Sequence, residues 1–106
     1  MGASHNMTEA DIQSNIRLEL SKHGKVFRMQ SGMFYTDSGA KIRIGIPGMS
    51  DLLFVGQGFT AWLEVKNAKG RPSKEQLNFI SEMQKLGHRA GIVRSVEEAL
   101  WLIEKN

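Results

Sequence analysis

The sequence predicts an α/β fold in which a mixed central sheet is flanked by helices on both faces. Three observations predict it. Helical patterns with capping residues occur near both ends of the chain. Residues 51–66 show the pattern of a β-hairpin, and another helical pattern separates this hairpin from a later apolar strand. The predicted order is αβββαβ with a C-terminal helix, and the helical crossover makes the sheet mixed.

The first predicted helix begins after Thr8, which can act as its N-cap, and runs to about His23. Asp11, three residues after Thr8, forms an acidic variant of the capping box. The helix has a buried stripe of aliphatic residues spaced one turn apart, namely Ile12, Ile16 and Leu20. Glu9 precedes this stripe by three residues and is therefore expected to point along the buried face.

A strand is predicted over residues 25–30, followed by a short ribbon that turns at residues 37–39. The second strand of this ribbon covers residues 40–46. In it Lys41 and Arg43 alternate with isoleucines, so one face is expected to be basic and the other apolar.

The most informative segment is the hairpin over residues 51–66. Asp51 begins one apolar run, Glu64 ends the next, and Gly56-Gln57-Gly58 lies between them as a tight-turn sequence. With Gln57 and Gly58 as the central turn residues, Asp51 directly faces Glu64, with Cα atoms about 4.5–5.5 Å apart. Like charges in that position are destabilising, and a bound divalent cation would account for them. Lys66 shares their face because strand side chains alternate.

A polar loop over residues 67–72 leads to Ser73, which can cap a second helix that ends at Gly87. The apolar residues expected to point inward from this helix are Leu77, Ile80, Met83 and Leu86. Residues 90–93 form a short apolar strand, and Ser95 opens the last helix with a capping box. The expected packing residues of that helix are Val96, Ala99, Leu100 and Ile103.

Composition limits the classes of protein that fit. The chain has 106 residues, no cysteine and a formal net charge of +3. Residues 7–106 are expected to form a single domain, and residues 1–6 resemble an expression-tag remnant. The lack of cysteine excludes disulfides, thiolate metal sites and cysteine nucleophiles. No apolar run is long enough to span a bilayer, so no membrane association is expected, and the lack of cysteine fits an intracellular protein.

The order of Asp51 and then Glu64-Val65-Lys66 resembles the active site of the PD-(D/E)xK nuclease superfamily. From Met7 onward the chain resembles a stand-alone VRR-NUC (virus-type replication-repair nuclease) domain. The features that carry this resemblance run in order along the sequence: Thr8 to Gln13, Phe27 to Gly32, Gly48 to Asp51, Glu64 to Lys66, Gly70 to Ser73, and Gln76. Ser50 departs from the proline of the superfamily name. The resemblance implies a restriction-endonuclease-like core.

The resemblance also implies the chemistry of the site. Asp51, Glu64 and the Val65 carbonyl would hold Mg²⁺ or Mn²⁺, for which oxygen ligands are suited. Lys66 would hold or help to deprotonate the attacking water and offset phosphate charge.

Glu9 and Gln76 have two interpretations each. Glu9 resembles the extra helix-borne acid of VRR-NUC domains, binding metal directly or through water, but acids are also common in a first helical turn. Gln76 resembles the family glutamine near the scissile phosphate or the lysine, and it also stands at the N3 position of a capping box with Ser73.

Basic residues dominate the middle of the chain. The residues predicted to bind DNA are Arg28, Lys41, Arg43, Lys69, Arg71 and Lys74. The leading hypothesis is a metal-dependent DNA endonuclease that is selective for structures such as Holliday junctions or flaps. The resemblance implies a homodimer, and the cytoplasm of a bacterial host or its phage-infected cell is a plausible location. The alternatives are a nicking or restriction-like nuclease on plain duplex and a catalytically silent DNA-binding module.

Overall fold

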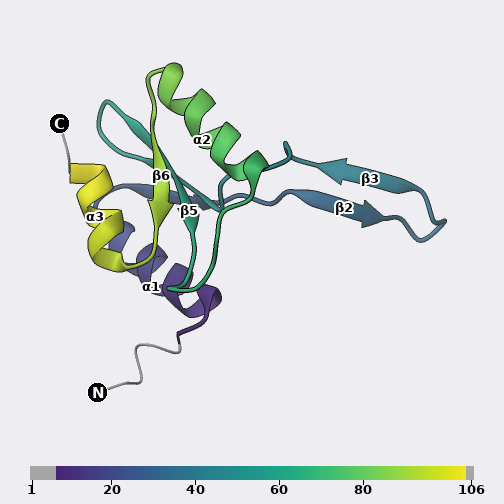
Figure 1. Cartoon of the computed structure of the whole chain (residues 1–106), viewed down its shortest axis with the longest axis horizontal. Helices are drawn as coiled ribbons and strands as arrows, with labels where there is room; N and C mark the ends of the chain where they lie inside the picture. Colours follow the sequence, from purple (N-terminus) through teal and green to yellow (C-terminus); the bar gives the residue numbers. More distant parts are fainter. Residues whose placement is uncertain (1–6, 105–106) are drawn as a thin grey trace.

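The structure is a computed structural model that describes residues 7–104, shown in Figure 1. The expected tag remnant, residues 1–6, lies outside the described residues. In chain order the elements are α1 (Glu9–Leu20), β1 (Lys25–Arg28), β2 (Gly32–Tyr35), β3 (Lys41–Ile44), β4 (Leu52–Val55), β5 (Thr60–Val65), α2 (Lys74–Lys85), β6 (Arg89–Val93) and α3 (Val96–Glu104).

The central sheet has four strands in the order β1-β4-β5-β6. Strands β1, β4 and β5 are antiparallel, whereas β6 runs parallel to β5 after the α2 crossover. The mixed sheet and the αβββαβ order with a C-terminal helix are therefore confirmed. The strands β2 and β3 form a separate two-stranded ribbon, which is inserted between the first and second strands of this core.

The two faces of the sheet have different roles. Helices α1 and α3 pack against each other on one face, and α2 covers the other (Figure 1). Strand β5 shows the division, because Ala61, Leu63 and Val65 alternate with Trp62 and Glu64. The first three belong to the hydrophobic core under α1 and α3. Trp62 and Glu64 therefore face α2, so the charged side chain of β5 lies on that face of the sheet.

Helix α1 begins as predicted and ends sooner. The Thr8 and Asp11 side chains form the expected capping box. The predicted stripe of Ile12, Ile16 and Leu20 is buried. The helix stops at Leu20 instead of continuing to His23, because the next residues form a turn in which the His23 N–H donates to the Leu20 carbonyl.

The β2–β3 ribbon projects away from the body of the molecule (Figure 1). Its register pairs Phe34 with Ile42 and Met33 with Arg43, and paired residues share a face. The expected apolar and basic faces are thus present. Both are exposed, however, since every residue of β3 and three of the four in β2 are open to solvent.

Helix α2 packs with only part of the predicted stripe. Ile80 is buried as predicted and Met83 is half-buried, and Phe79 is buried beside them, whereas Leu77 is 49% exposed and Leu86 is 70% exposed. The Phe79 ring meets the Trp62 ring edge-to-face, with centroids 5.1 Å apart. This aromatic contact sets the rotation of the helix on the sheet and turns Leu77 outward.

Helix α3 buries Ala99 and Ile103 as predicted, together with Leu102. Its capping arrangement differs in one bond. The Ser95 hydroxyl accepts from the Glu98 N–H, but Glu98 Oε1 accepts from the Arg94 N–H at 2.8 Å. None of the helices within residues 7–104 is long and apolar enough to cross a membrane.

Candidate active site

The β4–β5 hairpin has the register predicted from its turn. Leu52 pairs with Leu63, which places Asp51 opposite Glu64 one residue further along. The Gly56 N–H donates to the Phe59 carbonyl at 3.0 Å, so Gln57 and Gly58 are the central turn residues. The Asp51 carboxylate accepts a 2.9 Å hydrogen bond from the Val65 N–H through Oδ2. This bond fixes the Asp51 side chain at the end of β5.

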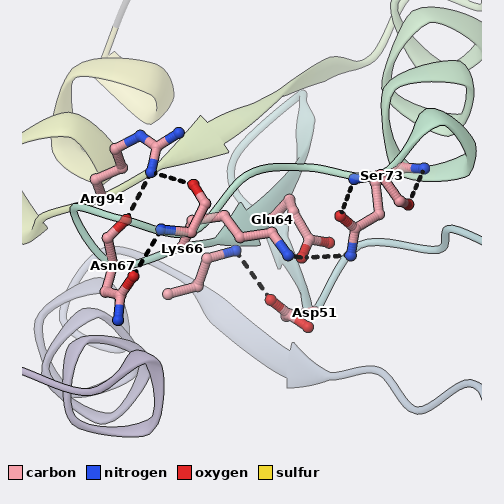
Figure 2. Close-up of polar contacts among 9 residues, drawn as sticks. Asp51, Glu64, Lys66, Asn67, Ser73 and Arg94 are labelled. Atoms are coloured by element: carbon pink, nitrogen blue, oxygen red, sulfur yellow. Dashed lines mark hydrogen bonds and ion pairs between the residues drawn. The ribbon is translucent and has the colours of Figure 1, made fainter.

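Glu64 lies at the centre of the site (Figure 2). Its side chain is only 3% exposed, and its Oε2 atom lies 3.7 Å from the Lys66 ammonium nitrogen. The same oxygen accepts a 3.0 Å hydrogen bond from Gln76 Nε2. The other oxygen, Oε1, is buried and has no hydrogen-bond partner within the described residues. A buried oxygen in this condition is costly unless another group binds it.

The surroundings of Glu64 favour its neutral form. Burial raises the pKa of the Glu64 carboxyl to about 8, and the negative charge of Asp51 adds to the rise. The nearby Lys66 ammonium acts in the opposite direction and lowers this pKa. A cation bound between Asp51 and Glu64 would reverse the balance, because positive charge stabilises the ionised carboxylate.

The donor set fits a small hard cation. Asp51 and Glu64 contribute carboxylate oxygens, including the unpartnered Oε1 of Glu64. The Ser50 hydroxyl beside Asp51 in the chain is also buried without a hydrogen-bond partner in the part that the structure describes. Across residues 7–104 no group of three or more His, Cys, Asp or Glu side chains is gathered for a metal. Two carboxylates with a backbone carbonyl and waters match the ligands that Mg²⁺ prefers.

Glu9 lies beside the Lys66 side of the site. A Cβ atom placed on Gly70 would be 2.6 Å from Glu9 Oε2 and 3.3 Å from Lys66 Cδ, so these atoms surround the Gly70 backbone. The structure does not join Glu9 to Asp51 and Glu64 in one carboxylate cluster. Its contact with a metal, direct or through water, stays a prediction.

Gln76 makes the predicted capping contacts and also bonds to Glu64, while its place near a phosphate or the lysine stays a prediction. Its Oε1 atom accepts from the Ser73 N–H at 2.8 Å, and its N–H donates to the Ser73 hydroxyl at 3.1 Å, which completes the capping box. Its Nε2 atom donates to Glu64. The start of α2 is held close to the turn before β4 at Gly48, where an added Cβ would lie 2.2 Å from the Glu75 carbonyl oxygen. Gly48 also has a φ of +83°, which favours glycine.

Two polar residues of the site were missed by the sequence analysis. Asn67 Oδ1 accepts from the N–H groups of Lys69 and Gly70, and Arg94 donates to the carbonyls of Asn67 and Gly70 (Figure 2). The spacing Asn-x-x-Gly after Lys66 is typical of such a side-chain turn and could have indicated the first. Arg94 directly follows β6, and no local pattern indicates that it would reach this loop.

All six basic residues predicted to contact DNA are exposed. They fall into three groups, with Arg28 on β1, Lys41 and Arg43 on the ribbon, and Lys69, Arg71 and Lys74 between Lys66 and the first turn of α2. The third group follows directly on Lys66, which places it at the edge of the site. The structure brings this group to the site but leaves the ribbon residues on a separate projection.

Comparison with known proteins finds a likeness among solved structures. No family model matches the sequence, and no curated protein is significantly similar to it. A solved structure described as a VRR_NUC domain superposes with a TM-score of 0.66 over 92% of this chain and 97% of that one. The sequence identity is 22%. At that identity the likeness concerns the fold, and it agrees with the resemblance found in the sequence. The chain therefore has the fold of a VRR_NUC domain, with Asp51, Glu64 and Lys66 together at the end of its central hairpin.

Proposed function

We propose that this protein is a metal-dependent endonuclease that hydrolyses DNA phosphodiester bonds. The observation that carries the proposal is the buried Glu64, whose Oε1 atom lacks a partner while Asp51 and Lys66 lie beside it. The Lys66 and Gln76 contacts both use Oε2, so Oε1 is left available for a cation. The fold shared with a VRR_NUC domain supports the same reading.

Asp51 and Glu64 would hold Mg²⁺ or Mn²⁺ together with the Val65 carbonyl. When bound, such a cation activates water and neutralises charge on the phosphoryl oxygens. Lys66 is 14% exposed, so its ammonium group is largely shielded while it remains within reach of a phosphate at the surface. Lys66 would orient the attacking water, and Gln76 would keep Glu64 in place.

The exposed basic residues would bind the DNA backbone. Lys69, Arg71 and Lys74 surround the site and would contact phosphates next to the cleaved one, while Arg28, Lys41 and Arg43 would contact phosphates further away. Phosphate contacts fix the position of a duplex without reading its sequence. A protein built on such contacts is expected to select DNA by its shape, which supports a branched substrate such as a junction or flap.

We also propose that the protein acts as a homodimer. The apolar face of the ribbon, which consists of Phe34, Ile42 and Ile44, is 42–45% exposed and carries no charge. Two-stranded ribbons are marginal in water unless one face is covered. An uncharged face can pack against its own copy without repulsion, and two copies would present two sites to two strands.

The deciding experiment is cleavage of labelled four-way junction, flap and linear duplex DNAs with Mg²⁺, with Mn²⁺ or with a chelator. We expect metal-dependent cleavage that is faster on branched DNA, and no cleavage by Asp51→Ala or Glu64→Ala protein that remains folded. Equal rates on all substrates would favour a nicking or restriction-like nuclease on plain duplex. Binding without cleavage would favour the catalytically silent module.

A further inference from the structure

Arg94 binds the backbone of the loop that follows Lys66 (Figure 2). Arg94 Nη1 donates to the Asn67 carbonyl at 2.6 Å and to the Gly70 carbonyl at 2.7 Å. Inside the loop, Asn67 Oδ1 accepts from the N–H groups of Lys69 and Gly70 at 3.1 and 2.8 Å. One guanidinium therefore closes the two ends of a four-residue turn.

This loop sets the relative position of two site residues. Lys66 directly precedes it, and Glu9 from α1 rests on Gly70 so closely that a Cβ atom there would lie 2.6 Å from Glu9 Oε2. The same added atom would lie 3.3 Å from Lys66 Cδ. A shift of the loop would thus move the Lys66 side chain relative to Glu9.

Within the loop, the Gly70 N–H also donates to the Asn67 carbonyl at 3.2 Å. A cavity of about 350 Å³, lined in part by Ile12, Ala68 and Arg94, lies next to the loop, and the Ala68 and Lys69 side chains are exposed. Arg94 is itself well anchored. Its N–H donates to Glu98 at 2.8 Å, and the preceding Val93 carbonyl accepts from the Lys66 N–H at 3.1 Å.

We propose that Arg94 is a positioning residue for the cleavage reaction, holding the Asn67–Gly70 loop so that Lys66 and Glu9 keep their productive places. The inference rests on the proposed nuclease function. Arg94 touches no reacting atom and acts through the loop. A planar guanidinium suits this role because it offers donors in a fixed arrangement, which a lysine ammonium does not.

The chain contains a matched control in Arg89, at the other end of β6. Arg89 Nη1 also donates to two backbone carbonyls, those of Leu102 and Ile103 near the end of α3. Its guanidinium lies over the Phe59 ring, 3.8 Å from the centroid. The two arginines therefore make comparable structural contacts, but only Arg94 contacts the loop that follows Lys66.

The first measurement compares kcat and KM for Arg94→Ala, Arg94→Lys and Arg89→Ala at saturating Mg²⁺, corrected for the folded fraction. We expect kcat of Arg94→Ala to fall by about 10- to 100-fold, the usual effect of losing a supporting contact behind a reactive group. KM should change less, Arg94→Lys should recover part of kcat, and Arg89→Ala should keep it. Equal kcat values for Arg94→Ala and Arg89→Ala would overturn the proposal.

The second measurement needs no activity. Hydrogen exchange of the Lys69 and Gly70 amides, in protein without metal or DNA, should become faster in Arg94→Ala and stay slow in Arg89→Ala. Unchanged exchange in Arg94→Ala would show that the loop holds itself and would overturn the proposal. If the wild-type protein cleaves no DNA, the proposed function fails, while the exchange rates still decide whether Arg94 holds the loop.

Discussion

Glu64 couples the stability of the protein to pH. Its pKa is about 8 in the folded protein, against 4.5 for an ordinary glutamate. Because the unfolded chain releases this proton more easily, metal-free protein should lose stability as pH rises from about 4.5 to about 8. The loss should be a few kcal/mol at most and should level off above that window. Thermal unfolding in chelator across this range measures it.

Glu64→Gln is the matched variant for this prediction, since it keeps the shape of the side chain and cannot ionise. Its stability should depend less on pH between 4.5 and 8, and added Mg²⁺ should stabilise wild-type protein but not the variant. Identical pH profiles for the two proteins would show that Glu64 ionises without penalty, against the burial described above.

Lys66 should affect the rate of cleavage more than the binding of DNA. If its ammonium group acts on the attacking water or the developing charge, Lys66→Ala should lower kcat by about 10²- to 10³-fold, with KM nearly unchanged. Single-turnover kinetics together with an equilibrium binding assay separate the two effects. Equal losses in binding and rate would make Lys66 a phosphate anchor instead.

The sequence predicted much of the site at this scale and missed its supporting residues. Asp51, Glu64 and Lys66 could be brought together because strand alternation and a two-residue turn fix the hairpin register. Arg94 could not be found in this way. Its contacts with Asn67 and Gly70 depend on the register of β6 against β5, and only the packing of the whole sheet determines that register.

At the scale of elements, the first turn of α2 serves both the helix and the site. Ser73→Ala removes a capping hydroxyl and should lower the free energy of unfolding by about 1 kcal/mol, leaving kcat per folded molecule unchanged. Gln76→Ala keeps the bond to the Ser73 hydroxyl, whose donor is the Gln76 backbone, but removes the reciprocal bond from the Ser73 N–H and the hydrogen bond to Glu64, so it should lower both the free energy of unfolding and kcat. Chemical denaturation and cleavage rates of the two variants distinguish these roles. A Gln76→Ala protein with full kcat would leave Gln76 only the capping role.

The helices also show where local patterns fail. The sequence predicted that α2 would pack through Leu77 and Leu86 as well as Ile80 and Met83. Ile80 is buried, but Leu77 and Leu86 point away from the sheet, and Phe79 packs on Trp62 instead. An apolar residue every three or four positions gives several possible stripes, and the partner surface chooses among them. In α1, where Ile12, Ile16 and Leu20 form one stripe and the exposed Leu18 lies outside it, the prediction of the buried stripe was confirmed.

At the scale of the whole molecule, the fold separates three tasks. One face of the sheet carries the apolar core under α1 and α3, and the other face, under α2, carries Glu64. The ribbon carries neither, because within the described residues β2 and β3 pack mainly on each other. The sequence indicated the two alternating faces of the ribbon but not that it projects from the molecule. Alternation predicts that a strand has one apolar and one polar face, but it does not predict which element packs on either face.

The last prediction concerns assembly through this ribbon. If the apolar faces of two ribbons pack together, wild-type protein should have twice the chain mass in solution, and Phe34→Ser should produce monomers with an intact site. Tyr35→Ser is the control, because Tyr35 is 65% exposed and lies on the opposite face of the same strand. It should leave the dimer intact.

A junction bound by two copies would meet two basic surfaces, so its affinity should fall more steeply with salt than the affinity of one duplex arm. Lys69→Ala should reduce the salt dependence of each by about one counterion per surface. Phe34→Ser should make the salt dependence of junction binding equal to that of duplex binding. A wild-type monomer, or a Phe34→Ser protein that still dimerises, would contradict assembly through the ribbon and would leave the nuclease site of the single chain as the functional unit.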